Sequence, residues 1–391
     1  MIVFDVIIVL VLVLALVMGI RRGFFASIGT LAGLAAGAFA ASWLAPLVSN
    51  LVPSPAWRTV AVIATVLGLL FAGGALGAWL GSLLRSGADR LKLRWAERLL
   101  GGIASVIAAV LALALVAPTL VAPGIPGVSA AVGSSYVLNA IKTVVPPPVE
   151  AALAELRSTF LADSIPRLGE LLGPARVAPT APPVALDDPE LAAAAASVAR
   201  VSGTAYACGR GATGSGFVIA PDRIVTNAHV VAGVDLPLVE LPGRPAREGR
   251  IVYFNEVVDL AVIAVDDLGA TPLPRAETLP AGRSAAVQGY PFGGPFTMTS
   301  ASVRDTGTAM IPDIYDRTSN PREIYSLESV VRPGNSGGPV LTGNGEVVGV
   351  VFARAENDEN LGYAMTMKEL EPVAELAGAA TDRVSTGDCV G

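Results

Sequence analysis

Four long apolar stretches at the start of the chain are the feature that most limits how it can fold. Each has about the 20 residues that a helix needs to cross a bilayer. A cleaved signal peptide is the weaker alternative for the first stretch, because that stretch has no positively charged start and no small-residue cleavage site. The sequence therefore predicts an α-helical membrane domain with four transmembrane helices. The stretches cover residues 2–20, 24–47, 59–84 and 99–121.

Composition separates this N-terminal region from the rest of the chain. Of the 391 residues, 52% are hydrophobic and 15% are charged, against about 25% charged residues in an average soluble domain. The apolar excess lies in residues 2–121, whereas residues 200–391 have the composition of an ordinary soluble domain. The net charge of −6 provides no basic surface, which argues against nucleic acid as a partner.

The basic residues between the apolar stretches predict the orientation of the membrane domain. Loops rich in lysine and arginine stay in the cytoplasm. The loops after the first and third stretches hold seven such residues, whereas the loop after the second holds one and residues 122–141 hold none. The N-terminus and everything after residue 121 are therefore expected on the periplasmic side of a bacterial plasma membrane. The seven residues are Arg21, Arg22, Arg85, Arg90, Lys92, Arg94 and Arg98, and the single one is Arg58.

Residues 122–200 have the character of a connector. Their proline clusters "VVPPPV" and "PTAPPV" resist regular structure. Apolar residues recur at helical spacing from Val149 to Phe160, which predicts a short amphipathic helix that lies on the membrane or packs on the next domain. Asp188 is the expected N-cap of a second helix that runs to about Val201. The predicted domains are 1–121 for the membrane part, 122–200 for the connector and 201–391 for a soluble domain.

From residue 203 onward the pattern becomes that of a β-rich domain. Short apolar runs such as "SGFVIAP", "GRIVYF" and "EVVGVVFA" alternate with turns rich in glycine, proline and aspartate. A helical period returns only in "TMKELEPVAELAG" near the end of the chain. The pattern predicts an all-β barrel or sandwich pair followed by a C-terminal helix.

The segment "GNSGGP" holds a serine, Ser336, in a setting that suits neither a helix nor a regular strand. A serine hydroxyl is a weak nucleophile until a neighbouring base takes its proton. The chain has one histidine, His229 in "TNAHVV", which is the only candidate imidazole base. Asp259 opens the apolar run "DLAVIAV", where a carboxylate needs a partner, and it can orient that base. Considered alone, His229 also fits a structural role as a histidine in the core, and Asp259 also fits a structural role as a turn residue.

The glycines around Ser336 fit the same chemistry. Acyl transfer needs backbone N–H groups that point at the developing oxyanion. A tight loop that places the amides of Gly334 and Ser336 side by side needs backbone angles that glycine adopts at low cost. Gly334 and Ser336 are therefore the predicted oxyanion hole, and Gly337 and Gly338 leave room for the acyl group of a substrate.

Three motifs, in order, resemble the trypsin-like serine proteases and most closely their HtrA-type bacterial branch. They are "GSGFVIAPDRIVTNAHVV", "DLAVIAV" and "RPGNSGGPV", and "LGYAMTM" resembles the strand that closes the specificity pocket in HtrA-type enzymes. The order His, Asp, Ser is that of the chymotrypsin fold. The resemblance implies a chymotrypsin-like double β-barrel. It also implies that His229 is the general base, Asp259 orients it and Ser336 attacks the peptide carbonyl.

The rest of the chain adds a second resemblance. The apolar N-terminal region, with "GIRRGFF" after its first stretch, is similar to the colicin V production (CvpA) family of membrane proteins. With the proline-rich connector and one pair of cysteines, the whole chain resembles the MarP-type membrane-anchored periplasmic serine proteases of mycobacteria and related actinobacteria. These proteases are associated with survival in acid, so the resemblance implies a role in acid or envelope stress resistance.

The resemblance also places the specificity pocket. Its expected walls are residues 327–332 and 350–354, which are mainly apolar or small where they would face a substrate. Val330 stands six residues before Ser336, where trypsin-like enzymes have an aspartate, so an uncharged P1 residue is expected. The predicted pocket residues are Val330, Val351, Phe352 and Ala353.

Cys208 and Cys389 lie near the two ends of the soluble domain. Outside the cytoplasm such a pair tends to oxidise, and a bridge that closes a loop of roughly 180 residues would stabilise the domain by about 5 kcal/mol in the chain-entropy model. Two free thiols are the alternative. One histidine and two cysteines do not make a usual zinc site, so neither a metal nor a cofactor is expected.

These observations favour an integral membrane serine endopeptidase that cleaves proteins of the cell envelope. Its expected partners are protein substrates and the lipid bilayer, with possible self-association, and self-cleavage is expected between about residues 160 and 200. One alternative is a transporter or channel regulated by the soluble domain, although Asp5 is the only acidic residue within an apolar stretch. Another alternative is a non-catalytic peptide-binding receptor.

Overall fold

The chain forms two compact units in a computed structural model. The structure describes residues 2–51, 55–88, 94–116, 135–158, 165–169, 171–172, 184–205 and 210–390. The first unit contains the helices up to residue 116 together with residues 135–145, and the second contains the described residues from 146 onward. Each unit is described separately below.

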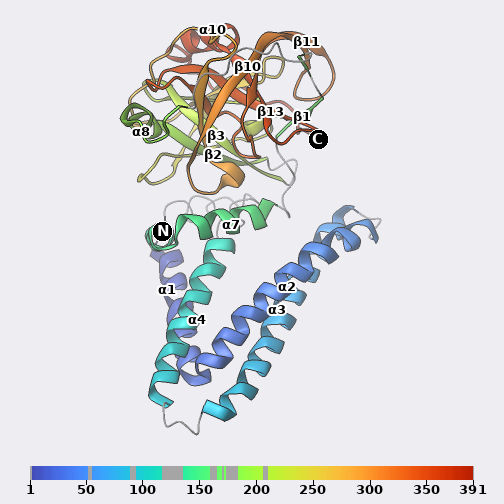
Figure 1. Cartoon of the computed structure of the whole chain (residues 1–391), viewed down its shortest axis with the longest axis vertical. Helices are drawn as coiled ribbons and strands as arrows, with labels where there is room; N and C mark the ends of the chain where they lie inside the picture. The colour runs from blue at the N-terminus through green and yellow to red at the C-terminus, as the bar shows by residue number, and fades with distance from the viewer. Residues whose placement is uncertain are drawn as a thin grey trace. The chain divides into compact units, whose positions relative to one another are not determined.

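The first unit is entirely helical (Figure 1). Its helices are α1 (Ile2–Arg22), α2 (Phe24–Leu51), α3 (Pro55–Ala88), α4 (Arg94–Val116) and α6 (Tyr136–Val144). Among the described residues, α1, α2 and α4 are long and apolar enough to cross a membrane, and α3 contains a shorter apolar stretch, Leu67–Leu83. Apolar N-terminal helices are therefore confirmed, whereas the number of four membrane spans stays a prediction.

Helices α2 and α3 pack through glycines that recur every four residues. A Cβ atom added at Gly33 would overlap the carbonyl oxygen of Gly73, and one added at Gly77 would overlap that of Gly29. Two helix backbones can approach so closely only where side chains are absent. The small-residue spacing in the sequence thus corresponds to a backbone-to-backbone contact.

Asp5, the acidic residue of α1, binds the start of α6. Its Oδ1 accepts hydrogen bonds from Ser135 Oγ at 2.5 Å and from the Val137 N–H at 3.3 Å. Ser135 is itself the N-cap of α6 and accepts from the Leu138 N–H at 3.1 Å. A carboxylate is favourable at a helix N-terminus, where backbone N–H groups lack intrahelical partners. Asp5 therefore has a structural partner within the first unit.

The second unit is built on two seven-stranded sheets (Figure 1). The first sheet has the order β6 (Arg247–Glu248), β5 (Leu238–Glu240), β2 (Val198–Ala205), β3 (Arg210–Ala220), β4 (Arg223–Thr226), β8 (Leu260–Ala264), β7 (Arg250–Asn255). The second has the order β1 (Arg167–Leu168), β13 (Val347–Ala355), β12 (Pro339–Leu341), β9 (Ser284–Gly289), β10 (Thr297–Pro312), β11 (Ser319–Glu328), β14 (Leu361–Thr366). Because β13 pairs with both β12 and β14, strands β9 to β14 close on themselves.

Helices complete this unit. Two of them, α7 (Pro147–Ser158) and α8 (Pro189–Ala195), come from the connector, and α7 packs against the short helix η4 (Pro291–Gly293). The packing of α7 on the protein agrees with one of the two positions expected for it. The predicted N-cap of α8 is confirmed, because Asp188 Oδ1 accepts from the Glu190 N–H at 3.2 Å. Its predicted end near Val201 is wrong, since Val198 already pairs with Phe217 as part of β2.

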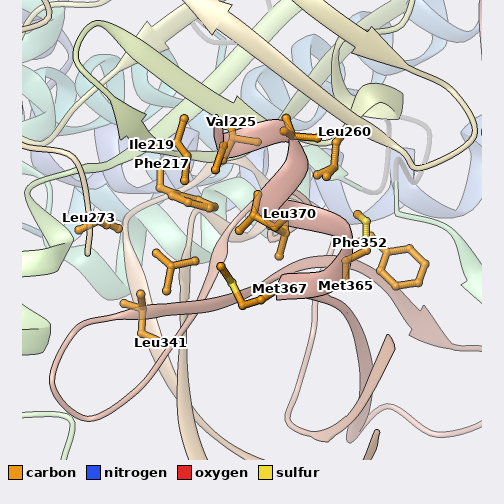
Figure 2. Close-up of a cluster of buried hydrophobic side chains, with 14 of the residues drawn as sticks. Phe217, Ile219, Val225, Leu260, Leu273, Leu341, Phe352, Met365, Met367 and Leu370 are labelled. Atoms are coloured by element: carbon orange, nitrogen blue, oxygen red, sulfur yellow. The ribbon is translucent and has the colours of Figure 1, made fainter. Parts of the chain in front are cut away.

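A hydrophobic core joins the two sheets to the C-terminal helix α10 (Met367–Ala377). Figure 2 shows this cluster, in which Phe217, Val225 and Leu260 of the first sheet lie with Leu341 and Met365 of the second, together with Leu370 of α10. The short strands therefore bury their apolar residues between two sheets, and the predicted β-rich fold with a C-terminal helix is confirmed.

Candidate active site

His229 and Asp259 form a buried hydrogen-bonded pair. His229 lies in the short helix α9 (Ala228–Val231), which follows β4, and Asp259 directly precedes β8. The Asp259 carboxylate accepts from Nδ1 of His229 at 2.8 Å and from the His229 backbone N–H at 2.9 Å. The two side chains are only 2% and 4% exposed. With its proton on Nδ1, the neutral ring has Nε2 as its free basic nitrogen.

The backbone around Asp259 is held in an unusual conformation. Its φ of +62° lies in the left-handed region, which aspartate adopts more readily than most residues. The Asp259 N–H donates to Asn255 O at 2.9 Å, and the Asp259 carbonyl accepts from Asn227 Nδ2 at 2.9 Å. Asn227 is the N-cap residue of α9, so the same side chain links the segment of His229 to that of Asp259.

The Ser336 loop packs against strand β3. The Ser336 carbonyl accepts from the Ser215 N–H of β3 at 2.8 Å. Gly337 has a φ of +82°, and a Cβ atom there would overlap Ser215 O and lie 3.1 Å from the Asn227 N. Glycine is required at this position both for its backbone angle and for the close approach. This contact brings the loop of Ser336 next to the segment that carries His229.

The backbone N–H groups of Gly334 and Ser336 form the second part of the site. The carbonyl of Pro333 accepts a hydrogen bond from the Phe292 N–H of η4. Because a trans peptide directs its C=O and N–H to opposite sides, the Gly334 N–H points away from η4. The Gly334 carbonyl accepts from Ser215 Oγ at 2.7 Å. Within the described part of the chain, neither N–H donates a hydrogen bond, so both are available to an oxyanion.

Ser336 Oγ and His229 Nε2 are both buried, and neither has a hydrogen-bond partner among the described residues. Counted over the whole residue, backbone included, Ser336 is 0% exposed and His229 is 7% exposed. Buried polar atoms without a partner are uncommon because leaving them so costs free energy. Both atoms therefore keep their hydrogen-bonding capacity for another group, and catalytic hydrogen bonds are often long in structures without substrate.

Two contacts fix the short helix η4 next to the Ser336 loop, one with a cation and one with an aromatic ring. Arg200 Nη1 donates to Gly293 O at 3.0 Å, and the same guanidinium binds Glu240. Tyr290 lies beside it, with its ring 6.0 Å from the Arg200 guanidinium. Burial raises the pKa of Tyr290 to about 12, so its hydroxyl stays protonated and donates to Val198 O at 3.2 Å.

The predicted pocket residues lie on β13 and on the segment before Ser336. Val351 and Phe352 are fully buried in two different hydrophobic clusters, and Ala353 is buried as well. Val330 is half-buried, and the neighbouring Arg332 is exposed, with its guanidinium 5.8 Å from the Phe292 ring. The role of these residues in a specificity pocket stays a prediction.

Cys389 is disulfide-bonded. Its predicted partner Cys208 lies outside the described residues, so the pairing of the two stays a prediction. Among the residues that the structure describes, no group of three or more His, Cys, Asp and Glu side chains could hold a metal ion.

Comparison with known proteins identifies both units. Residues 4–146 match the family model of the colicin V production protein, and residues 214–350 match that of the trypsin-like peptidase domain. The serine protease Rv3671c of Mycobacterium tuberculosis is 32% identical over 352 residues, which cover 89% of this chain and 88% of that protein. The chain belongs to the Rv3671c family of serine proteases.

A solved structure of Rv3671c and one further relative agree with this family. The crystal structure of the Rv3671c protease in its active form matches 57% of this chain and 100% of that chain, with 37% identity and a TM-score of 0.53. A probable periplasmic serine endoprotease, DegP-like, of Pseudomonas savastanoi is 33% identical over 180 residues, which are 44% of this chain and 36% of that protein. The chymotrypsin-like fold is thus confirmed for this Rv3671c-type protein.

The comparisons also decide between the functions considered from sequence. This Rv3671c-type protein is a serine endopeptidase, and its apolar helices and colicin V-type domain are those of a membrane anchor. A protease is favoured over a transporter, a channel or a peptide-binding receptor. Protein substrates follow from the same family.

Several residues of the site were not singled out from sequence. Ser215 lies within "GSGF" and Asn227 lies two residues before His229, so both stood inside the motifs as unmarked polar residues. Phe292 contributes only its backbone N–H, which no side-chain pattern can reveal. The motifs pointed to the region, and only the fold shows which polar groups hold it together.

Proposed function

We propose that this protein cleaves envelope proteins outside the cytoplasm with a catalytic triad of Ser336, His229 and Asp259. The observation that carries the proposal is the buried His229–Asp259 pair, which lies beside a serine loop with two unengaged N–H groups. The chymotrypsin-type order of the three residues and the Rv3671c relationship support the same roles.

In the proposed reaction, Ser336 Oγ attacks the carbonyl carbon of a peptide while His229 Nε2 takes the serine proton. Asp259 holds the ring by accepting from Nδ1 and stabilises the imidazolium that forms. The N–H groups of Gly334 and Ser336 donate to the oxyanion of the tetrahedral intermediate. The imidazolium then gives its proton to the leaving amine, and an acyl ester remains on Ser336. Water, deprotonated by His229, hydrolyses this ester and restores the serine.

Active-site labelling tests this assignment directly. A fluorophosphonate probe should modify the wild-type protein at Ser336, because only an activated serine reacts readily with such a probe. Ser336→Ala should remove the label, and His229→Ala should slow the labelling strongly. Equal labelling of the wild type and the Ser336→Ala variant would contradict the proposal.

The proposed location of the protease domain is the periplasmic side of the plasma membrane, where it would serve acid or envelope stress resistance. The distribution of basic residues supports this orientation, and one relative of the protease domain is named as periplasmic. Reporter fusions after residue 200 should be active only outside the cytoplasm, and fusions near residue 90 only inside it. The opposite pattern would overturn the orientation. The same compartment would allow a Cys208–Cys389 disulfide to persist.

We also propose that the connector is cleaved by the protease itself between residues 160 and 200. Residues 160–164, 170 and 173–183 of this stretch lie outside the described residues. Around them, the connector lies on the protease domain at the edge of β13. The N–H groups of Arg354 and Glu356 donate to Pro166 O at 3.1 Å and to Leu168 O at 3.0 Å, and Ile165 is 3% exposed.

The position of this contact favours self-cleavage. The same strand β13 binds the Ser336 loop, because the Val351 N–H donates to Gly338 O at 3.0 Å. Strand β12 pairs with β13 only up to Val350, so the later residues of β13 offer an edge to an extended peptide. In the structure, Pro166–Leu168 takes that edge. A connector held there competes with other substrates for this edge.

The full-length wild type should release a soluble C-terminal fragment that the Ser336→Ala variant does not release. Ile165→Asp, which places a charge at a buried position, should speed the hydrolysis of a peptide substrate by full-length protein. Leu186→Asp is the matched control, since Leu186 is a connector residue that is 39% exposed. Fragmentation at the same rate in the wild type and the Ser336→Ala variant would rule out self-cleavage. Self-association stays a prediction.

A further inference from the structure

Arg322 is a buried cation that joins the second sheet to the segment of Asp259. It lies on β11 and is 3% exposed, and its guanidinium is 5.4 Å from the centre of the Phe352 ring. Nη1 donates to Val258 O at 3.0 Å, and Nη2 donates to Pro312 O at 2.6 Å. Its Nε is buried without a partner among the described residues. The contact with Val258 reaches the residue directly before Asp259.

This contact completes the fixation of the backbone around Asp259. Arg322 holds the carbonyl of the Val258–Asp259 peptide, and Asn255 O accepts from the N–H of the same peptide. Asn227 Nδ2 binds the carbonyl of the next peptide. Both peptide planes that flank the Asp259 Cα are therefore held, which fixes its φ of +62° and the direction of its carboxylate. Asn255 and Asn227 come from the first sheet, whereas Arg322 comes from the second.

The charge of Arg322 also matters, because a buried cation needs negative charge nearby. Burial lowers the pKa of Arg322, and the attraction of Asp259, Glu369 of α10 and Asp313 opposes this effect, in that order. Glu369 already accepts from the Glu323 N–H at 2.9 Å, and Asp313 accepts from the Thr318 hydroxyl at 2.8 Å. Arg322 forms no ion pair within 4.0 Å with a described carboxylate, so its direct polar contacts are the carbonyl oxygens of Val258 and Pro312.

We propose that Arg322 is a positioning residue of this protease: it orients the Asp259 carboxylate toward His229 through the Val258 carbonyl. The proposal rests on the triad proposed above. A carboxylate held in one direction keeps the His229 ring in the orientation in which Nε2 can take the serine proton.

The test compares kcat and KM for full-length Arg322→Met and Arg322→Lys proteins. Arg322→Met approximates the length of the side chain but removes its charge and both donors. Loss of alignment should lower kcat by about 10- to 100-fold while KM stays within about 2-fold. Arg322→Lys keeps the charge and a donor, so its kcat should recover in part.

Arg223→Met is the matched control for a purely structural effect. Arg223 is also buried, at 9% exposure, and its Nε donates to Ala377 O and Ala380 O near the end of α10, both at 3.1 Å. Its loss should lower the melting temperature without lowering kcat. A wild-type kcat in Arg322→Met would overturn the proposal, as would an equal loss of kcat in Arg322→Met and Arg223→Met.

If Arg322→Met does not fold, Arg322→Gln decides by the same criteria, because its amide keeps a polar group at this site while its shorter side chain cannot bridge the carbonyls of Val258 and Pro312. The Ser336→Ala protein separates this inference from the triad beneath it. Full activity of Ser336→Ala would mean that the triad is wrong, whatever Arg322 does. An inactive Ser336→Ala with wild-type behaviour of Arg322→Gln and Arg322→Met would refute the positioning role alone.

Discussion

The helical unit and the protease unit are each stabilised internally by a different kind of packing. In the helical unit, α2 and α3 meet where side chains are absent, at glycines such as Gly33 and Gly77 whose partners are carbonyl oxygens of the facing helix. In the protease unit, large side chains such as Phe217, Phe352 and Leu370 fill the space between sheets and helix. Lipid offers little hydrophobic gain for helix association, so close backbone approach replaces burial as the source of stability.

This difference predicts where each unit is vulnerable. A residue that adds volume should damage the helical unit wherever two backbones touch. In the protease unit the sensitive glycines are instead those of the Ser336 loop, and damage there should affect chemistry before it affects folding. The predictions below test this contrast, beginning with the largest effect.

Ser336→Ala and His229→Ala should each lower kcat/KM for a peptide substrate by about 10⁴-fold or more, because the nucleophile and the base act as a unit. Ser336 Oγ has no partner among the described residues, so Ser336→Ala should keep the melting temperature and the membrane insertion of the wild type. His229→Ala also removes the buried partner of the Asp259 carboxylate, so its melting temperature should fall. More than a tenth of wild-type activity in Ser336→Ala would refute the assignment.

Gly337→Ala should lower kcat/KM by about 100-fold, since misplacement of reacting groups by an ångström can cost that much. Alanine is strained at a φ of +82°, and its Cβ would overlap Ser215 O. The loop must shift, and Ser336 shifts with it. Gly378→Ala is the control, because nothing lies within 4 Å of a Cβ atom there. Kinetics on both purified proteins provide the comparison, and equal activity would mean that the loop tolerates the added methyl group.

Gly77→Val should separate α2 from α3 while leaving hydrolysis by the protease unit intact. Its side chain would overlap the Gly29 carbonyl, and overpacking of this kind costs about 1–3 kcal/mol or more. Gly68→Val lies on the same helix and has nothing within 4 Å of an added Cβ atom. Thermal denaturation in detergent should show a lower midpoint for Gly77→Val alone. A similar loss of stability in both variants would reduce the effect to one of helix propensity.

The sequence predicted those features of each unit that depend on local signals. It predicted the helix positions in the first unit because apolar length and glycine spacing are local signals, and α1 to α4 lie where apolar stretches were expected. The hydrogen-bond partner of Asp5 could not be predicted from the sequence. Ser135 is 130 residues away along the chain, and nothing in the pattern of α1 indicates it.

In the protease unit, too, the sequence predicted some features and not others. Its fold and its serine protease family were predicted because three motifs occur in order. The role of Arg322 was hidden, since it depends on the carbonyl of Val258, and a backbone atom carries no sequence signature. The end of α8 was misplaced because the alanine-rich segment suits a helix, whereas pairing of Val198 with Phe217 starts β2. Long-range pairing overrides local preference there.

Asp313 gives the smallest predicted effect and tests whether acid weakens the protease unit. Its carboxylate lies in the loop between β10 and β11 and accepts from the N–H groups of Tyr315, Arg317 and Thr318 at 2.9–3.0 Å. Burial alone would raise the pKa of Asp313, but these hydrogen bonds outweigh it and hold the pKa below its usual range. A lowered pKa contributes stability that is fully present above the unfolded value, about 3.9, and is lost as the pH falls through the folded value.

Asp313→Asn should therefore lower the melting temperature by a few degrees, because an amide cannot accept at both of its terminal atoms. The difference from the wild type should be constant between pH 7 and pH 5 and should shrink only below about pH 4, where the wild-type carboxylate becomes protonated. Asp316→Asn, an exposed change in the same loop with a φ of +57°, is the matched control. If the difference between Asp313→Asn and the wild type disappeared already at pH 5, this carboxylate would not keep the protease unit stable in mild acid.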